Sequence, residues 1–143
     1  MRRLLVLLLA VVLLGGCGDD GDAYCDAVAE RQEELSEIVG GGSPDALIQA
    51  LDIFRELQDE APSDISDEWQ QVVSSVEGLE QALDDAGVDP ATYDPESPPA
   101  GLGEAEQQEI AAAASRLGSA ETAQALQALD QQARDVCKTP LTL

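Results

Sequence analysis

The sequence predicts an all-α fold, an antiparallel bundle of four to five helices that a disulfide bond closes between the two ends of the domain. Three observations predict this fold class. Apolar residues recur every three to four positions in several segments, which is the spacing of one face of a helix. The alternation typical of strands never extends beyond a few residues. Finally, Cys25 and Cys137 lie near the two ends of the helical region.

The first predicted helix covers residues 23–39. Three consecutive glycines at 40–42 follow it, and they end the helix because glycine is a poor helix former. Its apolar positions fall on one helical stripe together with the first cysteine of the domain, and these residues are Cys25, Val28, Leu35 and Val39.

The second predicted helix covers residues 43–62. Its first three residues supply an N-cap (Ser43), a proline at the first helical position (Pro44) and an early acid (Asp45). Pro62 ends the helix because proline cannot continue it. The predicted core face consists of Leu47, Leu51, Phe54 and Leu57, with Ile48 flanking it.

The third predicted helix covers residues 65–86 and has the most regular pattern. Its apolar residues are four, three, four, three and four positions apart, which is typical of the seam of a helical bundle. Trp69, like Phe54 in the helix before, is predicted to lie in the core, and Gly87 is the expected C-cap. The seam consists of Ile65, Trp69, Val72, Val76, Leu79 and Leu83.

A proline-rich loop is predicted over residues 88–103, which have no apolar period. Helix resumes near Glu104 and extends to Cys137, with a break or kink at Gly118 and Ser119. Ser119 can cap the second piece, and the pattern leaves open whether the region is one kinked helix or two. Its predicted core positions are Ile110, Ala114, Leu117, Leu126, Leu129, Ala133 and Val136.

The N-terminus has the composition of an export signal. Arg2 and Arg3 precede an unbroken apolar run of eleven residues, Leu4 to Leu14. That length suits a signal peptide and falls short of the roughly 20 residues of a membrane-spanning helix. We therefore expect residues 1–16 to be a signal peptide.

The apolar run ends in Leu14-Gly15-Gly16-Cys17, which resembles the lipobox of bacterial lipoproteins. The resemblance implies cleavage before Cys17, attachment of diacylglycerol and palmitate to that residue, and a place at the cell membrane on its extracytoplasmic face. Residues 17–22 would be a lipid-anchored, flexible tether, and residues 23–143 the helical domain. The alternative is an ordinary signal peptide or an uncleaved anchor, with Cys17 unmodified.

Cys25 and Cys137 are predicted to form a disulfide bond. Each lies on the buried stripe of its helix, and an up-down-up-down bundle brings the start of its first helix and the end of its last to the same pole. Export permits oxidation, and lipidation of Cys17 would leave only these two thiols. The alternative is a pair of buried, reduced cysteines.

Residues 23–143 also resemble small secreted or lipid-anchored helical proteins of high-GC actinobacteria. The resemblance rests on a composition rich in alanine and acids and poor in lysine, and on the segments AYCDAV and ARDVC near the two ends. It implies a helical, exported domain and no particular activity.

The domain is strongly acidic. Removal of residues 1–16 leaves 127 residues with five basic and 29 acidic side chains, a net charge of −24. Such a chain repels nucleic acid and anionic lipid headgroups, so we expect no nucleic-acid partner and contact with the membrane only through the N-terminal lipid. Solubility outside the cell explains the charge, and cation binding is the alternative.

No catalytic motif is present in the sequence. It contains no histidine, the commonest general base and metal ligand, so Ser-His and Cys-His pairs are excluded. We expect no enzymatic activity, no cofactor and no metal site, since residues 84–89 lack the alternating acids of a calcium loop. The candidate binding residues are Tyr93, Asp89 and Asp94 in the proline-rich loop, where the tyrosine ring either contacts a partner or packs on the bundle.

These observations predict a non-enzymatic, lipid-anchored helical protein that binds an envelope protein or another envelope component. The alternative is a substrate- or cation-binding lipoprotein associated with a transporter, which the negative charge favours. An enzyme would need a mechanism that uses carboxylates alone.

Overall fold

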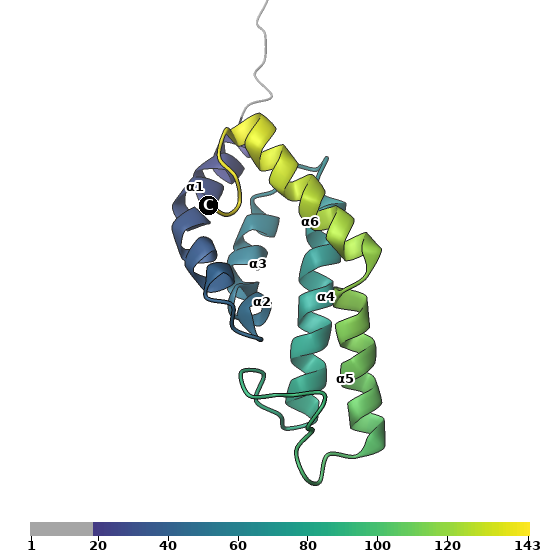
Figure 1. The fold of residues 1–143 in the computed structure, drawn as a ribbon. Helices are drawn as coiled ribbons and strands as arrows, with labels where there is room; N and C mark the ends of the chain where they lie inside the picture. Colours follow the sequence, from purple (N-terminus) through teal and green to yellow (C-terminus); the bar gives the residue numbers. More distant parts are fainter. Residues whose placement is uncertain (1–18) are drawn as a thin grey trace, which may run out of the picture.

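The computed structural model describes residues 19–143, and within this range the chain folds into six α-helices and one π-helical turn, with no strand (Figure 1). The all-α prediction is confirmed. The predicted signal peptide, its predicted cleavage site and Cys17 lie outside the described residues. The elements are α1 (Asp19–Gly40), α2 (Ala46–Gln49), α3 (Leu51–Asp59), α4 (Ser66–Asp85), α5 (Glu104–Leu117), α6 (Ala120–Gln132) and the π-helical turn η1 (Ala133–Cys137).

α1 begins earlier than predicted, inside the segment 17–22 that we expected to be a flexible tether. Asp22 in its first turn favours a helix start at this point, because an acid interacts favourably with the positive end of the helix dipole. The helix ends at Gly40, followed by the two further glycines that the sequence analysis identified as its end.

The predicted helix 43–62 is two helices, α2 and α3, which are separated at Ala50. α2 begins only at Ala46, and the Ser43 hydroxyl bonds to the Asp45 carboxylate instead of capping a backbone N–H group. The prediction of an N-cap at Ser43 is therefore wrong. The predicted core face is confirmed in α3, whose buried residues are Leu51, Ile53, Phe54 and Leu57.

α4 is the central helix of the fold (Figure 1). α3 packs on one side of it, while α5 and α6 follow one another along α4 in the opposite direction. α1 packs against α2, α3 and η1. The end of η1 therefore lies beside the first turns of α1, at Cys25, and the last residue, Leu143, lies farther along the same helix beside Ser36 (Figure 1).

α5 and α6 are separate helices rather than one kinked helix. Gly118 follows the last residue of α5, and Ser119 has an extended backbone with φ −68° and ψ 159°. The Ser119 hydroxyl accepts a hydrogen bond from the backbone N–H of Thr122 at 3.2 Å, so the predicted N-cap is confirmed.

The core is centred on Trp69, which is fully buried in α4. Its indole N–H donates a hydrogen bond to the Tyr24 hydroxyl at 3.2 Å, and the two rings pack edge to face with centroids 6.4 Å apart. The Phe54 ring centroid lies 5.9 Å from that of Trp69. Trp69 and Phe54 are core residues, as predicted, and Tyr24 is an additional one.

The buried stripe of α1 is displaced from the predicted one. Val39 is 41% exposed, and Cys25 lies at the edge of the core, so aligning the stripe on the cysteine misplaces the residues at its far end. The predicted core position of Val39 is therefore wrong. The core residues of α1 are Tyr24, Ala27, Val28 and Leu35.

The predicted disulfide bond between Cys25 and Cys137 is present, with sulfur atoms 2.03 Å apart and Cα atoms 5.0 Å apart. It joins α1 to the last residue of η1. Because the two cysteines are 112 positions apart, the bond closes most of the described chain into one loop.

Two other predicted core positions, Ala114 and Val136, are exposed. The buried face of α5 contains Ala113 instead of Ala114. Val136 is 58% exposed because it lies in the π-helical turn, whose wider i→i+5 spacing rotates the residues that follow Ala133. The α-helical spacing that placed Val136 in the core does not apply there.

The C-terminal tail, residues 138–143, folds back onto α1. Lys138 has a left-handed backbone with φ 60°, which reverses the chain after η1. The Gln32 side-chain amide donates a hydrogen bond to the Pro140 carbonyl at 2.8 Å, and Leu141 is buried in the core. The tail therefore reinforces the connection that the disulfide makes.

We predict that breaking the disulfide bond lowers stability. In the chain-entropy model, closing a loop of this length contributes about 4–5 kcal/mol, which corresponds to a change in melting temperature on the order of 15 °C. Reduced wild type, Cys25→Ser and Cys137→Ser should melt at similar temperatures when followed by circular dichroism. A reduced protein as stable as the oxidised one would contradict this prediction.

A second prediction concerns alkaline pH. Burial raises the pKa of Tyr24 to about 12, although its hydrogen bond with Trp69 opposes the rise. Because this folded-state pKa is above the ordinary value of 10.0, the contribution of the neutral side chain is complete below pH 10 and is lost as the pH rises to about 12. The free energy of unfolding in urea should fall by about 1.4 kcal/mol per pH unit across this window.

Tyr24→Phe is the control for this titration, because it keeps the ring and removes the ionisable hydroxyl. Its free energy of unfolding should lose the steep fall between pH 10 and about 12. Identical pH profiles for Tyr24→Phe and wild type would show that Tyr24 is not the group responsible.

Candidate functional site

The candidate binding residues lie in the loop 88–103, at the end of the molecule opposite to the start of α1 (Figure 1). Gly87, directly before this loop, has a positive φ of 65°, and the backbone N–H of Val88 donates a hydrogen bond to the Leu83 carbonyl at 2.9 Å. This pattern is a Schellman motif, so the predicted C-cap at Gly87 is confirmed. The loop has no helix or strand of its own, as predicted.

The hydrogen bonds of the loop are local. Asp89 accepts one from the backbone N–H of Ala91 at 3.0 Å, and Asp94 accepts one from the backbone N–H of Glu96 at 2.8 Å. Among residues 19–143, the loop forms no hydrogen bond with any helix except α4 and α5, which adjoin it in sequence. Apolar contacts therefore hold the middle of the loop against the bundle.

Tyr93 is half-buried and faces the helices. Together with Leu79, Leu83 and Ile110 it lines a cavity of about 230 Å³ between the loop, α4 and α5. Asp45, the residue before α2, lines the same cavity. The structure thus brings Tyr93 to the cavity, whereas Asp89 and Asp94 are exposed, bond to the backbone of the loop and do not line it.

The lengths of the helices explain this cavity. α3 has 9 residues and α4 has 20, so beyond α3 only the four-residue helix α2 packs against α4 on that side. The predicted seam continues into the C-terminal half of α4 as Leu79 and Leu83, and the proline-rich loop covers them. The apolar seam predicted for α4 is longer than α3, and this difference in length is the sequence signal that could have located the cavity. Nothing in the sequence assigns Asp45 to the cavity.

A second cavity, of about 330 Å³, lies where α5 ends and α6 begins. The buried Thr122 hydroxyl donates a hydrogen bond to the Arg116 backbone carbonyl at 3.0 Å and lies 3.2 Å from the Ser75 hydroxyl. The Gln71 side-chain amide donates a further hydrogen bond to Thr122 at 3.1 Å. These polar side chains satisfy one another and a carbonyl at the break between the two helices, which gives their burial a structural reason.

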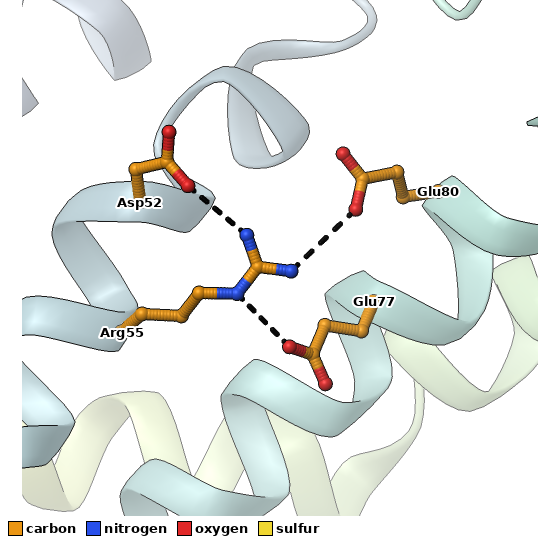
Figure 2. Close-up of polar contacts among 4 residues, drawn as sticks. All are labelled: Asp52, Arg55, Glu77 and Glu80. Atoms are coloured by element: carbon orange, nitrogen blue, oxygen red, sulfur yellow. Dashed lines mark hydrogen bonds and ion pairs between the residues drawn. The ribbon is translucent and has the colours of Figure 1, made fainter.

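Arg55 on α3 lies among three carboxylates (Figure 2). Its Nε atom is 3.0 Å from Glu77, and its terminal nitrogens are 3.0 Å from Asp52 and 3.7 Å from Glu80. The hydrogen bond with Glu77 is the main cause that raises the pKa of the Arg55 guanidinium. One cation therefore connects α3 to α4 and offsets part of the negative charge on this surface.

Among residues 19–143, no group of three or more histidine, cysteine, aspartate or glutamate side chains is arranged to hold a metal ion. None of the helices in this range combines the length and the hydropathy that a membrane-spanning segment requires. Comparisons with protein-family models, with curated proteins and with solved structures found no match to this chain.

We predict that Tyr93→Ala releases the loop from the helices. Loss of the ring lowers the free energy that holds the loop on the helices by about 1.5 kcal/mol, so the loop should be open about tenfold more often. A protease specific for acidic residues should therefore cut the chain at Asp94 or Glu96 about tenfold faster. Tyr93→Phe keeps the ring and should be cut at the wild-type rate. Equal cleavage rates for Tyr93→Ala and wild type would mean that Tyr93 does not hold the loop.

Proposed function

We propose that this chain is a lipid-anchored binding protein on the extracytoplasmic face of the cell membrane, that it has no enzymatic activity, and that it binds an envelope protein or another envelope component. The observation that carries the proposal is the disulfide bond between Cys25 and Cys137. Disulfide bonds persist mainly outside the reducing cytosol. The bond therefore supports export, in agreement with the signal-like N-terminus and the resemblance of residues 14–17 to a lipobox.

Cys17 is the proposed attachment point. Only Gly18 separates it from Asp19, where α1 begins. Because one residue of chain spans at most about 3.6 Å, an anchor at Cys17 would keep the start of α1 close to the membrane. The acyl chains would supply the attachment, since the strongly acidic domain gains nothing from anionic headgroups.

The proposed binding end is the opposite one, which carries the loop 88–103. α4 runs from the anchored end toward the loop, and its 20 residues correspond to a length of about 30 Å. The loop is longer than the usual 2–8 residue connection between packed helices, and long ordered loops are often functional. Tyr93 on this loop is the aromatic residue available for a partner contact once the loop moves.

The second candidate function is a substrate- or cation-binding lipoprotein associated with a transporter. The observation that favours it is the acidic surface, of which the carboxylates around Arg55 are one part (Figure 2). In that case a small ligand, rather than a protein, would select the folded state and raise its melting temperature.

The experiment that tests the proposal is chemical crosslinking in the native host, followed by affinity purification and mass spectrometry. We predict that wild type captures an abundant envelope partner, and that Cys17→Ser loses it because the unanchored domain no longer stays at the membrane. Tyr93→Ala should capture several-fold less of the partner while keeping its helical circular dichroism spectrum. Undiminished capture by Cys17→Ser would contradict the anchored form of the proposal.

The same sample reports the anchor itself. Trypsin cuts after Arg31, so a processed and acylated chain gives the peptide 17–31 with the added mass of its acyl groups. A peptide that begins at Leu4 would instead indicate an uncleaved anchor. An acylated chain without a partner, whose melting temperature rises with Ca²⁺, Mg²⁺ or cationic metabolites, would favour the transporter-associated function.

A further inference from the structure

The cavity beneath the proline-rich loop combines apolar walls with charge of one sign. Its apolar lining includes Ile48, Leu79, Leu83, Tyr93 and Ile110. Among the described residues that line it, Asp45 is the only one with an ionised side chain, and none is basic. An occupant therefore meets an apolar surface and a single carboxylate.

The surroundings of Asp45 favour the ionised form of its carboxyl group. The Ser43 hydroxyl donates a hydrogen bond to its carboxylate, and this bond is the main cause that lowers the pKa of Asp45. No lysine or arginine in residues 19–143 forms an ion pair with Asp45, whereas Arg31, Arg55 and Arg134 each pair with other carboxylates. The charge that faces the cavity is therefore not neutralised by a cationic side chain of the described chain.

The loop can admit an occupant at low cost in hydrogen bonds. Its middle, which carries Tyr93, is held only by apolar contact, because Asp89 and Asp94 bond to the backbone of the loop itself. Moving the loop outward would expose Leu79 and Leu83 without breaking a hydrogen bond to α4 or α5 beyond its two ends.

We propose that this cavity binds a small organic cation, a protonated amine carried on a compact apolar body. The ammonium group lies at Asp45, and the apolar body packs against Leu79, Leu83 and Tyr93. The volume of about 230 Å³ is below the roughly 300–1,000 Å³ of most drug-sized sites, which is why the body must be compact.

Charge complementarity selects this class of ligand over other apolar occupants. A carboxylate would be repelled by Asp45 and by the acidic domain, and a neutral molecule would gain no ion pair. The inference rests on the proposed function in one respect, since it takes the loop end of the molecule as the binding end.

The test uses three probes with the same ring and different head groups: benzylamine, benzyl alcohol and benzoate. They are titrated into the purified full chain in lipid nanodiscs, with ¹³C labels on the isoleucine δ1 methyl groups. Benzylamine should shift the signals of Ile48 and Ile110, which line the cavity, and leave those of the core residues Ile53 and Ile65 unchanged. Benzyl alcohol should bind about three- to fivefold more weakly, and benzoate should cause no shift at the same concentrations.

Two aspartate substitutions distinguish an ion pair at Asp45 from the effect of the overall negative charge of the domain. Asp45→Asn should weaken the binding of benzylamine about three- to fivefold and leave the affinity for benzyl alcohol unchanged. Asp64→Asn removes the same charge from an exposed residue near the start of α4, and it should change neither affinity. Ala111→Leu, which places a larger side chain in the cavity from α5, should abolish binding of both probes.

The proposal is overturned if no probe shifts Ile48 or Ile110, if benzoate binds as well as benzylamine, or if Asp45→Asn and Asp64→Asn have equal effects. Because the titration measures the purified chain directly, these outcomes do not depend on partner capture in the host. A failed titration would leave the proposed anchored function standing. Conversely, a failed crosslinking experiment would not alter the titration.

Discussion

The covalent bond between Cys25 and Cys137 is the constraint on which the rest of this fold depends. α1 packs against the short α2 and α3 and against η1, and its main connection to the central helix α4 is the Tyr24 ring on Trp69. The last two helices are rich in alanine, which buries little apolar area per residue. A small core of this kind gains from a crosslink that restricts the unfolded chain. The tail with Leu141 adds noncovalent contacts farther along α1, at Gln32 and Ser36.

The disulfide bond joins the chain at one end of the molecule, and the end that carries the loop 88–103 has no such crosslink. α4 extends beyond α3, and α5 begins beside the far end of α4, so the proline-rich loop crosses an apolar surface that the short helix α2 covers only in part. Tyr93 packs there without hydrogen bonds to hold the loop, and Asp45 adds a carboxylate at the edge. The proposed attachment and the proposed binding site therefore lie at opposite ends of the molecule.

The sequence was sufficient for features that are set by local pattern. The regular spacing around Trp69, the C-cap at Gly87, the N-cap at Ser119 and the disulfide pairing all followed from it. Departures from a regular pattern did not follow from it, namely the break at Ala50 and the π-helical turn. Neither did the position of the tail, which depends on a hydrogen bond with Gln32, far away in the sequence. The same distinction holds for the candidate site. Tyr93 could be identified from the sequence as the aromatic residue of its loop, whereas only the folded chain brings Asp45 to the cavity.

The decisive measurement is a count of free thiols in the protein isolated from the membrane fraction, by alkylation and intact mass before and after reduction. A lipid on Cys17 and a bond between Cys25 and Cys137 predict no reactive thiol before reduction and two after it. One reactive thiol before reduction and three after it would contradict the lipid anchor. Two reactive thiols before reduction, with no change afterwards, would contradict the disulfide bond.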